Sequence, residues 1–138
     1  MANLYYGNFL LKPSNTYNGG QWTIARYNSF VKGALRSASQ RWPPKYTVLN
    51  EACIGQKINP TSGRLAKFYT CNACKEAFLA KLVEVNHIIP VIPVTGFDNW
   101  DGVIERMFCE KEHLEVCCKV CHKAITKQEN LTRKKPND

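Results

Sequence analysis

The feature that most constrains this 138-residue chain is a pair of Cys-x-x-Cys motifs. The first runs from Cys71 to Cys74, and the second from Cys118 to Cys121. A two-residue spacer lets a tight turn direct both sulfurs at one ion, and four thiolates match the tetrahedral preference of Zn²⁺. Two such motifs seldom arise among ordinary buried cysteines. The sequence therefore predicts a structural zinc site that stabilises a fold too small to depend on its core alone.

The remaining cysteines are interpreted as thiols outside this site. Cys117 could replace Cys118 only with a three-residue spacer, so we assign Cys117 to strand packing. Cys53 and Cys109 have no partner at a useful spacing. The total of seven cysteines is odd, and the start of the chain has no signal-peptide pattern, which together favour reduced thiols in a cytoplasmic protein. No stretch approaches the roughly 18 apolar residues that a membrane span requires.

Positive charge is concentrated in the first half of the chain. The protein has 19 Lys and Arg against 11 Asp and Glu, a formal net charge of +8. Residues 1–69 hold nine basic groups and one acidic group, whereas residues 70–138 hold ten of each. Because each Lys or Arg beside a phosphate releases a counterion, this asymmetry predicts a nucleic acid as partner, although a solvated basic surface explains the charge equally well. The candidate contact residues are Arg26, Lys32, Arg36, Arg41, Lys45, Arg64, Lys67 and Lys123.

Hydrophobic periodicity predicts a mostly helical N-terminal region followed by an α+β module. Residues 1–64 are expected to form a basic arm and helices, residues 65–130 a compact module, and residues 131–138 a flexible tail. The expected helices of the first region span Gln21–Gln40, which a pair of prolines must stop, and Lys45–Ile54. The module is expected to contain strands and helices in the order strand, strand, helix, strand, helix at Lys67–Thr70, Leu82–Ile89, Trp100–Cys109, His113–Cys117 and Cys121–Asn130.

All three histidines lie between the two Cys-x-x-Cys motifs or directly beside the second one. They are His87, His113 and His122. A single histidine on an apolar strand, such as residues 85–89, is more often a core residue than a catalyst. Three histidines that share one small module with a metal site favour a catalytic role instead.

Two segments around these histidines resemble the HNH endonucleases. Residues 84–90, with the sequence Glu-Val-Asn-His-Ile-Ile-Pro, resemble the family's Val-Asp-His-Ile-x-Pro segment. Residues 113–126, with the sequence His-Leu-Glu-Val-Cys-Cys-Lys-Val-Cys-His-Lys-Ala-Ile-Thr, resemble its Asn-Leu-x-x-Leu-Cys-x-x-Cys-His-x-x-Lys-Thr segment. The spacing inside each segment is preserved. The resemblance covers residues 68–130 and implies that this module adopts the ββα-metal fold.

The resemblance implies a role for each matching residue. His87 would be the general base that takes a proton from the attacking water. His122 would bind a catalytic divalent ion, Mg²⁺, Mn²⁺ or another, that stabilises charge on the scissile phosphate. Asn86 would be a further ligand where the family commonly has Asp, and its neutral oxygen predicts weaker Mg²⁺ binding. His113, where the family usually has Asn, would hold the loop between the strands in shape.

The function expected from the resemblance is hydrolysis of phosphodiester bonds in double-stranded DNA, as a nick or a cut. A non-catalytic zinc-ribbon module that binds nucleic acid is the main alternative, since it explains the cysteines and the charge but not the histidine spacing. An inactive DNA-binding relic of the family is a further alternative, because a fold does not guarantee a function. Small HNH proteins are often phage-encoded, which would put this chain in the cytosol of a host cell as a monomer or weak dimer.

Overall fold

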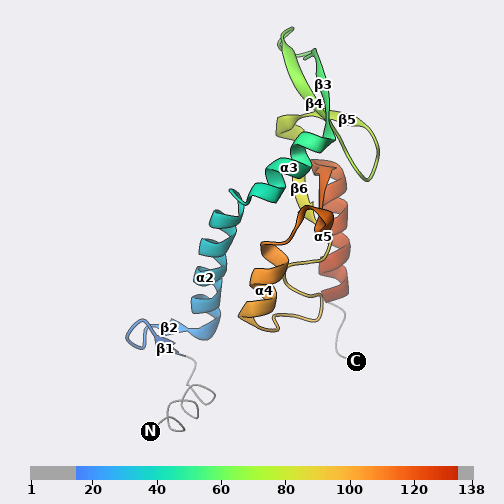
Figure 1. The fold of residues 1–138 in the computed structure, drawn as a ribbon. Helices are drawn as coiled ribbons and strands as arrows, with labels where there is room; N and C mark the ends of the chain where they lie inside the picture. The colour runs from blue at the N-terminus through green and yellow to red at the C-terminus, as the bar shows by residue number, and fades with distance from the viewer. Residues whose placement is uncertain (1–14, 134–138) are drawn as a thin grey trace. The chain divides into compact units, whose positions relative to one another are not determined.

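The computed structural model describes residues 15–133, which form a mixed α+β fold of small antiparallel sheets and four α-helices (Figure 1). The chain divides into two compact units, Met1–Ala38 and Ser39–Asp138. Parts of the predicted arm (residues 1–14) and of the predicted tail (residues 134–138) lie outside the described residues. No helix in the described part of the chain is both long and apolar enough to cross a bilayer.

The first unit pairs two short strands ahead of a helix. β1 (Asn15–Tyr17) runs antiparallel to β2 (Trp22–Thr23), and α2 (Ile24–Ser39) follows. The predicted helix Gln21–Gln40 is confirmed over most of its length. It begins three residues later than predicted because residues 22 and 23 pair with β1 instead of entering the helix.

The second unit opens with α3 (Pro43–Ala52). Its first two residues are the prolines that were expected only to stop the preceding helix. Proline is well tolerated in the first turn of a helix, where its missing N–H has no intrahelical partner. The predicted helix Lys45–Ile54 is therefore shifted toward the N-terminus, and it is wrong at its end, because its last two residues belong to the next strand.

A three-stranded antiparallel sheet follows, in the order β3-β4-β5. Its strands are β3 (Cys53–Ile58), β4 (Leu65–Thr70) and β5 (Ala77–Leu79). The hydrophobic pattern did not reveal β3, which pairs with β4 along its length. The boundary predicted between residues 64 and 65 consequently lies inside the β3-β4 hairpin.

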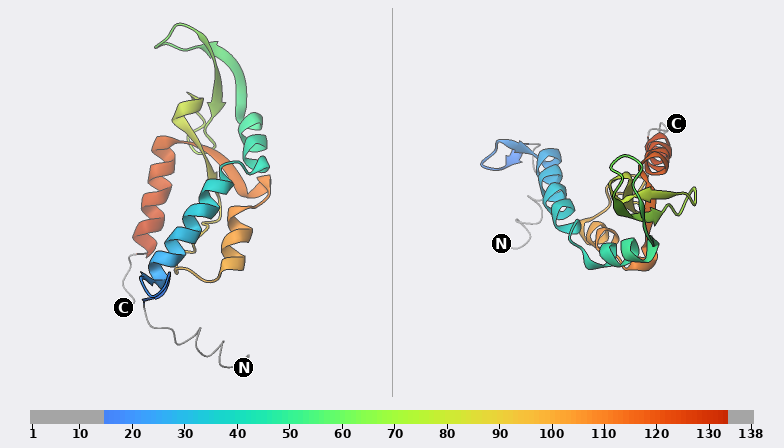
Figure 2. Two further views of the ribbon diagram at one scale, coloured as in Figure 1. Left: turned by 90° about the vertical axis from the view of Figure 1, so that its left-hand side faces the viewer. Right: turned by 90° about the horizontal axis from the view of Figure 1, so that it is seen from above.

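A second antiparallel pair and a helix form the centre of this unit. β6 (Val83–His87) pairs with β7 (Leu114–Cys118), and α5 (Lys119–Arg133) follows β7 directly and contacts both strands (Figures 1 and 2). Both predicted strands are confirmed within two residues at each end. Because α5 continues to Arg133, the first three residues of the predicted tail 131–138 are helical.

Short helical elements occupy the connections around this pair. η1 (Ala80–Leu82) precedes β6, while α4 (Trp100–Met107) and η2 (Lys111–His113) lie between β6 and β7. The Asn99 side chain begins α4 by accepting a hydrogen bond from the Gly102 N–H at 2.7 Å. The helix predicted at residues 100–109 is thus confirmed with a slightly earlier end.

Two buried clusters hold the second unit together. In the first, Val48 of α3 packs with Tyr69, Val83, Leu114 and Val116. The second contains Cys71, Cys117 and Cys118, packed against Phe78, Cys121 and Ile125. The β6-β7 pair therefore contributes to both clusters, and four of the six residues of the second cluster are cysteines, from the two Cys-x-x-Cys segments and the neighbouring Cys117.

Candidate functional site

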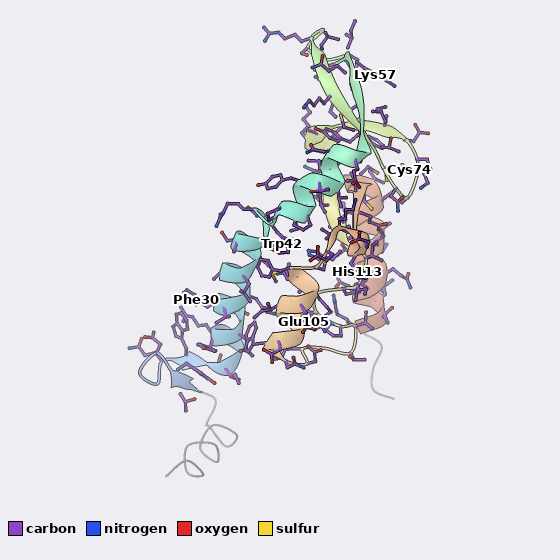
Figure 3. All side chains as sticks on the ribbon, in the orientation of Figure 1. Phe30, Trp42, Lys57, Cys74, Glu105 and His113 are labelled. Atoms are coloured by element: carbon purple, nitrogen blue, oxygen red, sulfur yellow. The ribbon has the colours of Figure 1, made fainter. Side chains whose placement is uncertain are left out.

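Four cysteine side chains meet near the junction of β7 and α5. Cys71 follows β4 directly, Cys74 closes the turn after it, Cys118 ends β7, and Cys121 lies in the first turn of α5 (Figure 3 labels Cys74). Their sulfur atoms all lie within 4.8 Å of one another. A tetrahedral ion with bonds of about 2.3 Å to sulfur places its ligands about 3.8 Å apart. The group could therefore hold a metal ion, and its donor set fits Zn²⁺.

Backbone N–H groups support these sulfur atoms. The Cys74 N–H donates to Cys71 Sγ at 3.5 Å, and the Cys121 N–H donates to Cys118 Sγ at 3.4 Å. Burial alone raises the pKa of Cys71, but nearby backbone N–H groups, that of Cys74 first, outweigh burial and lower this pKa to about 6. The Cys118 side chain, and then burial, raise the pKa of Cys121 to about 12. A bound cation is therefore needed for all four to be thiolates together.

Cys117 lies outside this group. Its side chain is buried, and its Sγ donates to Oε1 of Glu115 at 3.5 Å. Burial first, and then the Glu115 carboxylate, raise the pKa of Cys117 to about 12, so this side chain stays a neutral thiol. Its neighbour Cys118 belongs to the four-cysteine group instead, as the two-residue spacing predicts.

His122 is paired with a carboxylate between α5 and β6. Its Nδ1 lies 2.9 Å from Oε2 of Glu84, and both side chains are partly exposed. The two residues line a groove of about 640 Å³ together with Lys123, Thr126, Lys127, Asn130 and Leu131. Glu84 was not predicted as a site residue from the sequence. The available signal was strand alternation, which places Glu84 and Asn86 on the same face of β6.

His87, the last residue of β6, has a different protein partner. Its Nε2 lies 2.9 Å from the backbone carbonyl oxygen of Met107 at the end of α4. Because a carbonyl only accepts, this contact requires the hydrogen on Nε2 and leaves the lone pair of the neutral ring on Nδ1. Alternation places His87 on the face of β6 opposite to that of Glu84. The structure therefore gives the rings of His87 and His122 separate protein contacts.

Asn86 is tied to a second carboxylate. It is only 8% exposed, and its Nδ2 donates to Oε1 of Glu115 on β7 at 3.1 Å. The other oxygen of Glu115 accepts from Nδ2 of Asn72 at 2.7 Å, and Asn72 lies between Cys71 and Cys74. Glu115 thus bridges the first Cys-x-x-Cys turn and the strand that carries His87. This bridging carboxylate was also not predicted from the sequence.

We expect the substitution Asn86→Asp to destabilise the protein. The new carboxylate would be buried and would replace the amide that lies 3.1 Å from Glu115. Burial and the like charge would raise its pKa in the folded state, so the protonated form is tolerated and stability is lost as pH rises through that pKa. The expected loss is about 1–3 kcal/mol at pH 7.5 and smaller at about pH 5.5.

Urea unfolding at both pH values measures this effect. Asn72→Asp is the matched control, because it brings the same charge to the other oxygen of Glu115 at an exposed position and should cost less. An equal loss at both pH values for Asn86→Asp would contradict the proposed burial of the new charge.

His113 shapes the loop after β6 through its backbone. Its carbonyl oxygen accepts from the Ile88 N–H at 2.9 Å, and its own N–H donates to the Glu110 carbonyl oxygen at 3.0 Å. The exposed side chain lines a small cavity beside Ile89 and Arg106 (Figure 3 labels His113). These contacts connect the segment before β7 to the residue that follows His87.

The basic residues predicted to contact nucleic acid occur in both units. Arg26, Lys32 and Arg36 lie on α2 in the first unit, where Arg26 stacks over the Trp22 ring with 4.6 Å between the guanidinium and the ring centroid. In the second unit, Lys45 on α3 is half-buried and donates to the Ser39 hydroxyl at 3.3 Å. The remaining members are exposed, and they are Arg41, Arg64, Lys67 and Lys123.

Comparisons with known proteins give no relative for the chain. No protein-family model matches it, and no match was found among curated proteins or solved structures. Side-chain chemistry is therefore the basis for assigning a function.

Proposed function

We propose that the chain is a metal-dependent endonuclease of the HNH type, which hydrolyses phosphodiester bonds in double-stranded DNA. In this proposal β6, β7 and α5 form its ββα-metal module. The observation that carries the proposal is the 2.9 Å contact between Nδ1 of His122 and the Glu84 carboxylate. A histidine that donates one ring N–H to a carboxylate has its tautomer and orientation fixed, and this is the usual arrangement of a metal-ligating histidine.

The Nε2 atom of His122 would hold the catalytic ion. A bound Mg²⁺, Mn²⁺ or other divalent ion would stabilise charge on the scissile phosphate and on the leaving oxygen. Among residues 15–133, the four cysteines are the only group of three or more His, Cys, Asp or Glu side chains close enough to share one ion. Waters and phosphate oxygens would complete the ligand set at His122, with the amide oxygen of Asn86 as a further candidate, which is a manner of binding that suits Mg²⁺.

His87 would act as the general base. The Met107 carbonyl oxygen holds the hydrogen on Nε2, so Nδ1 is the atom that would take a proton from the attacking water. An imidazole suits this step because it exchanges its proton near neutral pH.

The groove beside His122 has the charge that a DNA backbone requires. Lys123 and Lys127 are exposed and lie four residues apart, so both reach the same side of α5. Thr126 and Asn130 add hydroxyl and amide groups that bind phosphate oxygens. A phosphate bound here would lie next to the proposed metal ligand.

A non-catalytic zinc-ribbon module that binds nucleic acid is the second candidate. The separate contacts of His87 and His122 favour it, as does the Asn86 amide, whose donor is engaged by Glu115. This candidate predicts DNA binding without cleavage under any metal condition.

Plasmid cleavage distinguishes the two candidates. Supercoiled plasmid is incubated with the zinc-loaded protein and Mg²⁺, Mn²⁺ or neither, and nicked and linear products are quantified on gels. The nuclease proposal expects product that depends on the added ion. Binding without product in every metal would leave the zinc-ribbon candidate.

Glu84→Gln is expected to weaken the catalytic metal site about 10–100-fold without abolishing it. The amide keeps the shape of the side chain but no longer accepts the His122 N–H as a charged partner. Cleavage should therefore need more Mg²⁺ for half-maximal rate and recover at high concentration. Glu112→Gln is the control, since Glu112 is an exposed carboxylate of η2 outside the groove. Equal metal titrations for the Glu84 variant and the wild type would remove Glu84 from the site.

A further inference from the structure

The β3-β4 hairpin extends beyond the rest of the second unit. Figures 1 and 2 show both strands projecting past the end of α3 and away from α5. Near its tip, Ile58 and Leu65 are a cross-strand pair, and each is 66% exposed. Ile54, at the other end of β3, is 48% exposed. Such an exposed aliphatic tip has no role in the core of this unit.

The charge of this hairpin has one sign. Residues 52–75 contain no acidic residue. The cations near the tip are Lys57, Arg64 and Lys67, and all are exposed (Figure 3 labels Lys57). The hairpin therefore has exposed aliphatic side chains near its tip and only positive charges beside them. This combination is complementary to a polyanion that has apolar groups inside a groove.

The register distributes these groups over both faces of the ribbon. Ile58↔Leu65 and Gln56↔Lys67 lie two residues apart along the strands, so these two pairs share a face. Lys57 lies between them on β3 and therefore projects from the opposite face. Lys57 and Lys67 thus put positive side chains on both sides of the ribbon, and the aliphatic pair lies nearer the turn than either of them.

β3 carries two features that disfavour pairing with another protein strand. It is the edge strand of its sheet, and it bears the exposed Lys57. A register shift between Cys53 and Gly55, where Gly55 has φ of +104°, bends its first half. Edge lysines and bulges are the usual protection against strand addition. A nucleic acid is therefore a better occupant than a second copy of this chain.

We propose that the β3-β4 hairpin enters the major groove of double-stranded DNA. A two-stranded ribbon fits this groove, which is about 12 Å wide and lined by phosphates on both walls. Lys57, Arg64 and Lys67 bind those phosphates, while the Ile58-Leu65 pair contacts base edges such as thymine methyl groups. This inference rests on the proposed function, for which it supplies the element that grips the duplex.

The base of the hairpin is anchored to the candidate metal centre. Tyr69 of β4 is buried in the cluster of Val48, and Cys71 follows β4 directly. The ribbon is therefore held at the four-cysteine group, which also contains the start of α5. If the hairpin binds in the major groove, it would hold the DNA duplex in a fixed position relative to the protein groove at His122.

Fluorescence anisotropy with a labelled A·T-rich duplex tests this inference, and the His87→Ala protein is used throughout, without added Mg²⁺ or Mn²⁺, to keep cleavage minimal. The triple variant Lys57→Gln/Arg64→Gln/Lys67→Gln should lower the slope of log affinity against log salt by about 0.9 per lost phosphate contact. Lys81→Gln removes an exposed charge outside the hairpin and should leave the slope unchanged.

The tip variant Ile58→Ser/Leu65→Ser separates apolar contact from charge. It should raise Kd roughly tenfold or more at fixed salt with an unchanged salt slope. Replacing thymine by uracil in the duplex removes major-groove methyl groups. This change should weaken DNA binding by the protein with an intact tip more than DNA binding by the tip variant. Circular dichroism and zinc content check that each variant is folded.

Two results would overturn the inference. One is unchanged DNA affinity in both hairpin variants. The other is a dimer, seen by analytical ultracentrifugation, that the tip variant dissociates while DNA affinity stays the same, because the hairpin would then be a self-association surface. Failure of the nuclease proposal is distinguishable, since wild-type protein would then leave plasmid uncut while the hairpin variants still weaken binding.

Discussion

Replacing His87 with alanine should lower the rate of DNA cleavage about 10²–10⁴-fold, the usual contribution of general acid–base catalysis. The substitution removes the Nδ1 atom that would accept a proton from water. It also removes the hydrogen bond to the Met107 carbonyl oxygen, which stabilises the fold by only about 1 kcal/mol. Initial rates of plasmid nicking measure the effect, and DNA affinity and zinc content should be unchanged.

Two controls separate a base from a structural histidine. His113 contacts Ile88 and Glu110 through its backbone alone. Removing its imidazole in His113→Ala should therefore cost much less activity. Added imidazole should partly restore cleavage by His87→Ala, because a small base can enter the space left by the ring. Wild-type activity in His87→Ala would exclude the base role and favour the zinc-ribbon candidate.

Sequence patterns predicted the strands and helices near the cysteine motifs well, because local signals agree there. β6 and β7 contain apolar residues, β7 ends at Cys118 of the second Cys-x-x-Cys motif, and α5 begins directly after Cys118, inside that motif. The four-cysteine group follows from this arrangement, since the Cys-x-x-Cys spacing already fixes two sulfurs in each turn. The roles of His87 and His122 remain predictions.

Features that depend on long-range pairing were not predictable from the same patterns. β3 contains Gly55 and Lys57 and is largely exposed, so no apolar alternation marks it as a strand. β3 is a strand because it pairs with β4, and the register of that pairing cannot be read from the periodicity of the sequence. The first two residues of this segment were expected to end the helix Lys45–Ile54, and the boundary was placed at residue 64, inside the hairpin.

The two carboxylates of the site were missed for a related reason. Glu84 and Glu115 act through partners distant in sequence, His122 in one case and Asn72 with Asn86 in the other. An exposed glutamate on a strand is ordinarily a solvated residue, so its type carries little information. Only the pairing of β6 with β7 and the position of α5 bring these side chains to their partners.

Removal of the zinc proposed at the four cysteines should unfold much of the second unit. The group joins the end of β4 to the start of α5, and four of the six residues in the second buried cluster are cysteines. Structural zinc sites contribute folding free energy directly, on the order of 10 kcal/mol in small domains. Cys118→Ser is therefore expected to lose both the ion and the cooperative thermal transition, measured by mass spectrometry and circular dichroism.

Cys53→Ser is the matched control for this prediction. Cys53 lies on β3, is only partly buried and is outside the four-cysteine group, so the same change of sulfur to oxygen should leave one zinc per chain. Lowering the pH should release the ion from the wild type, because protons compete for thiolate ligands. A zinc-free Cys118→Ser protein that melts like the wild type would show that the buried clusters alone hold the fold. His122 would then be held by α5 and Glu84 without help from the metal, and loss of zinc should leave cleavage intact.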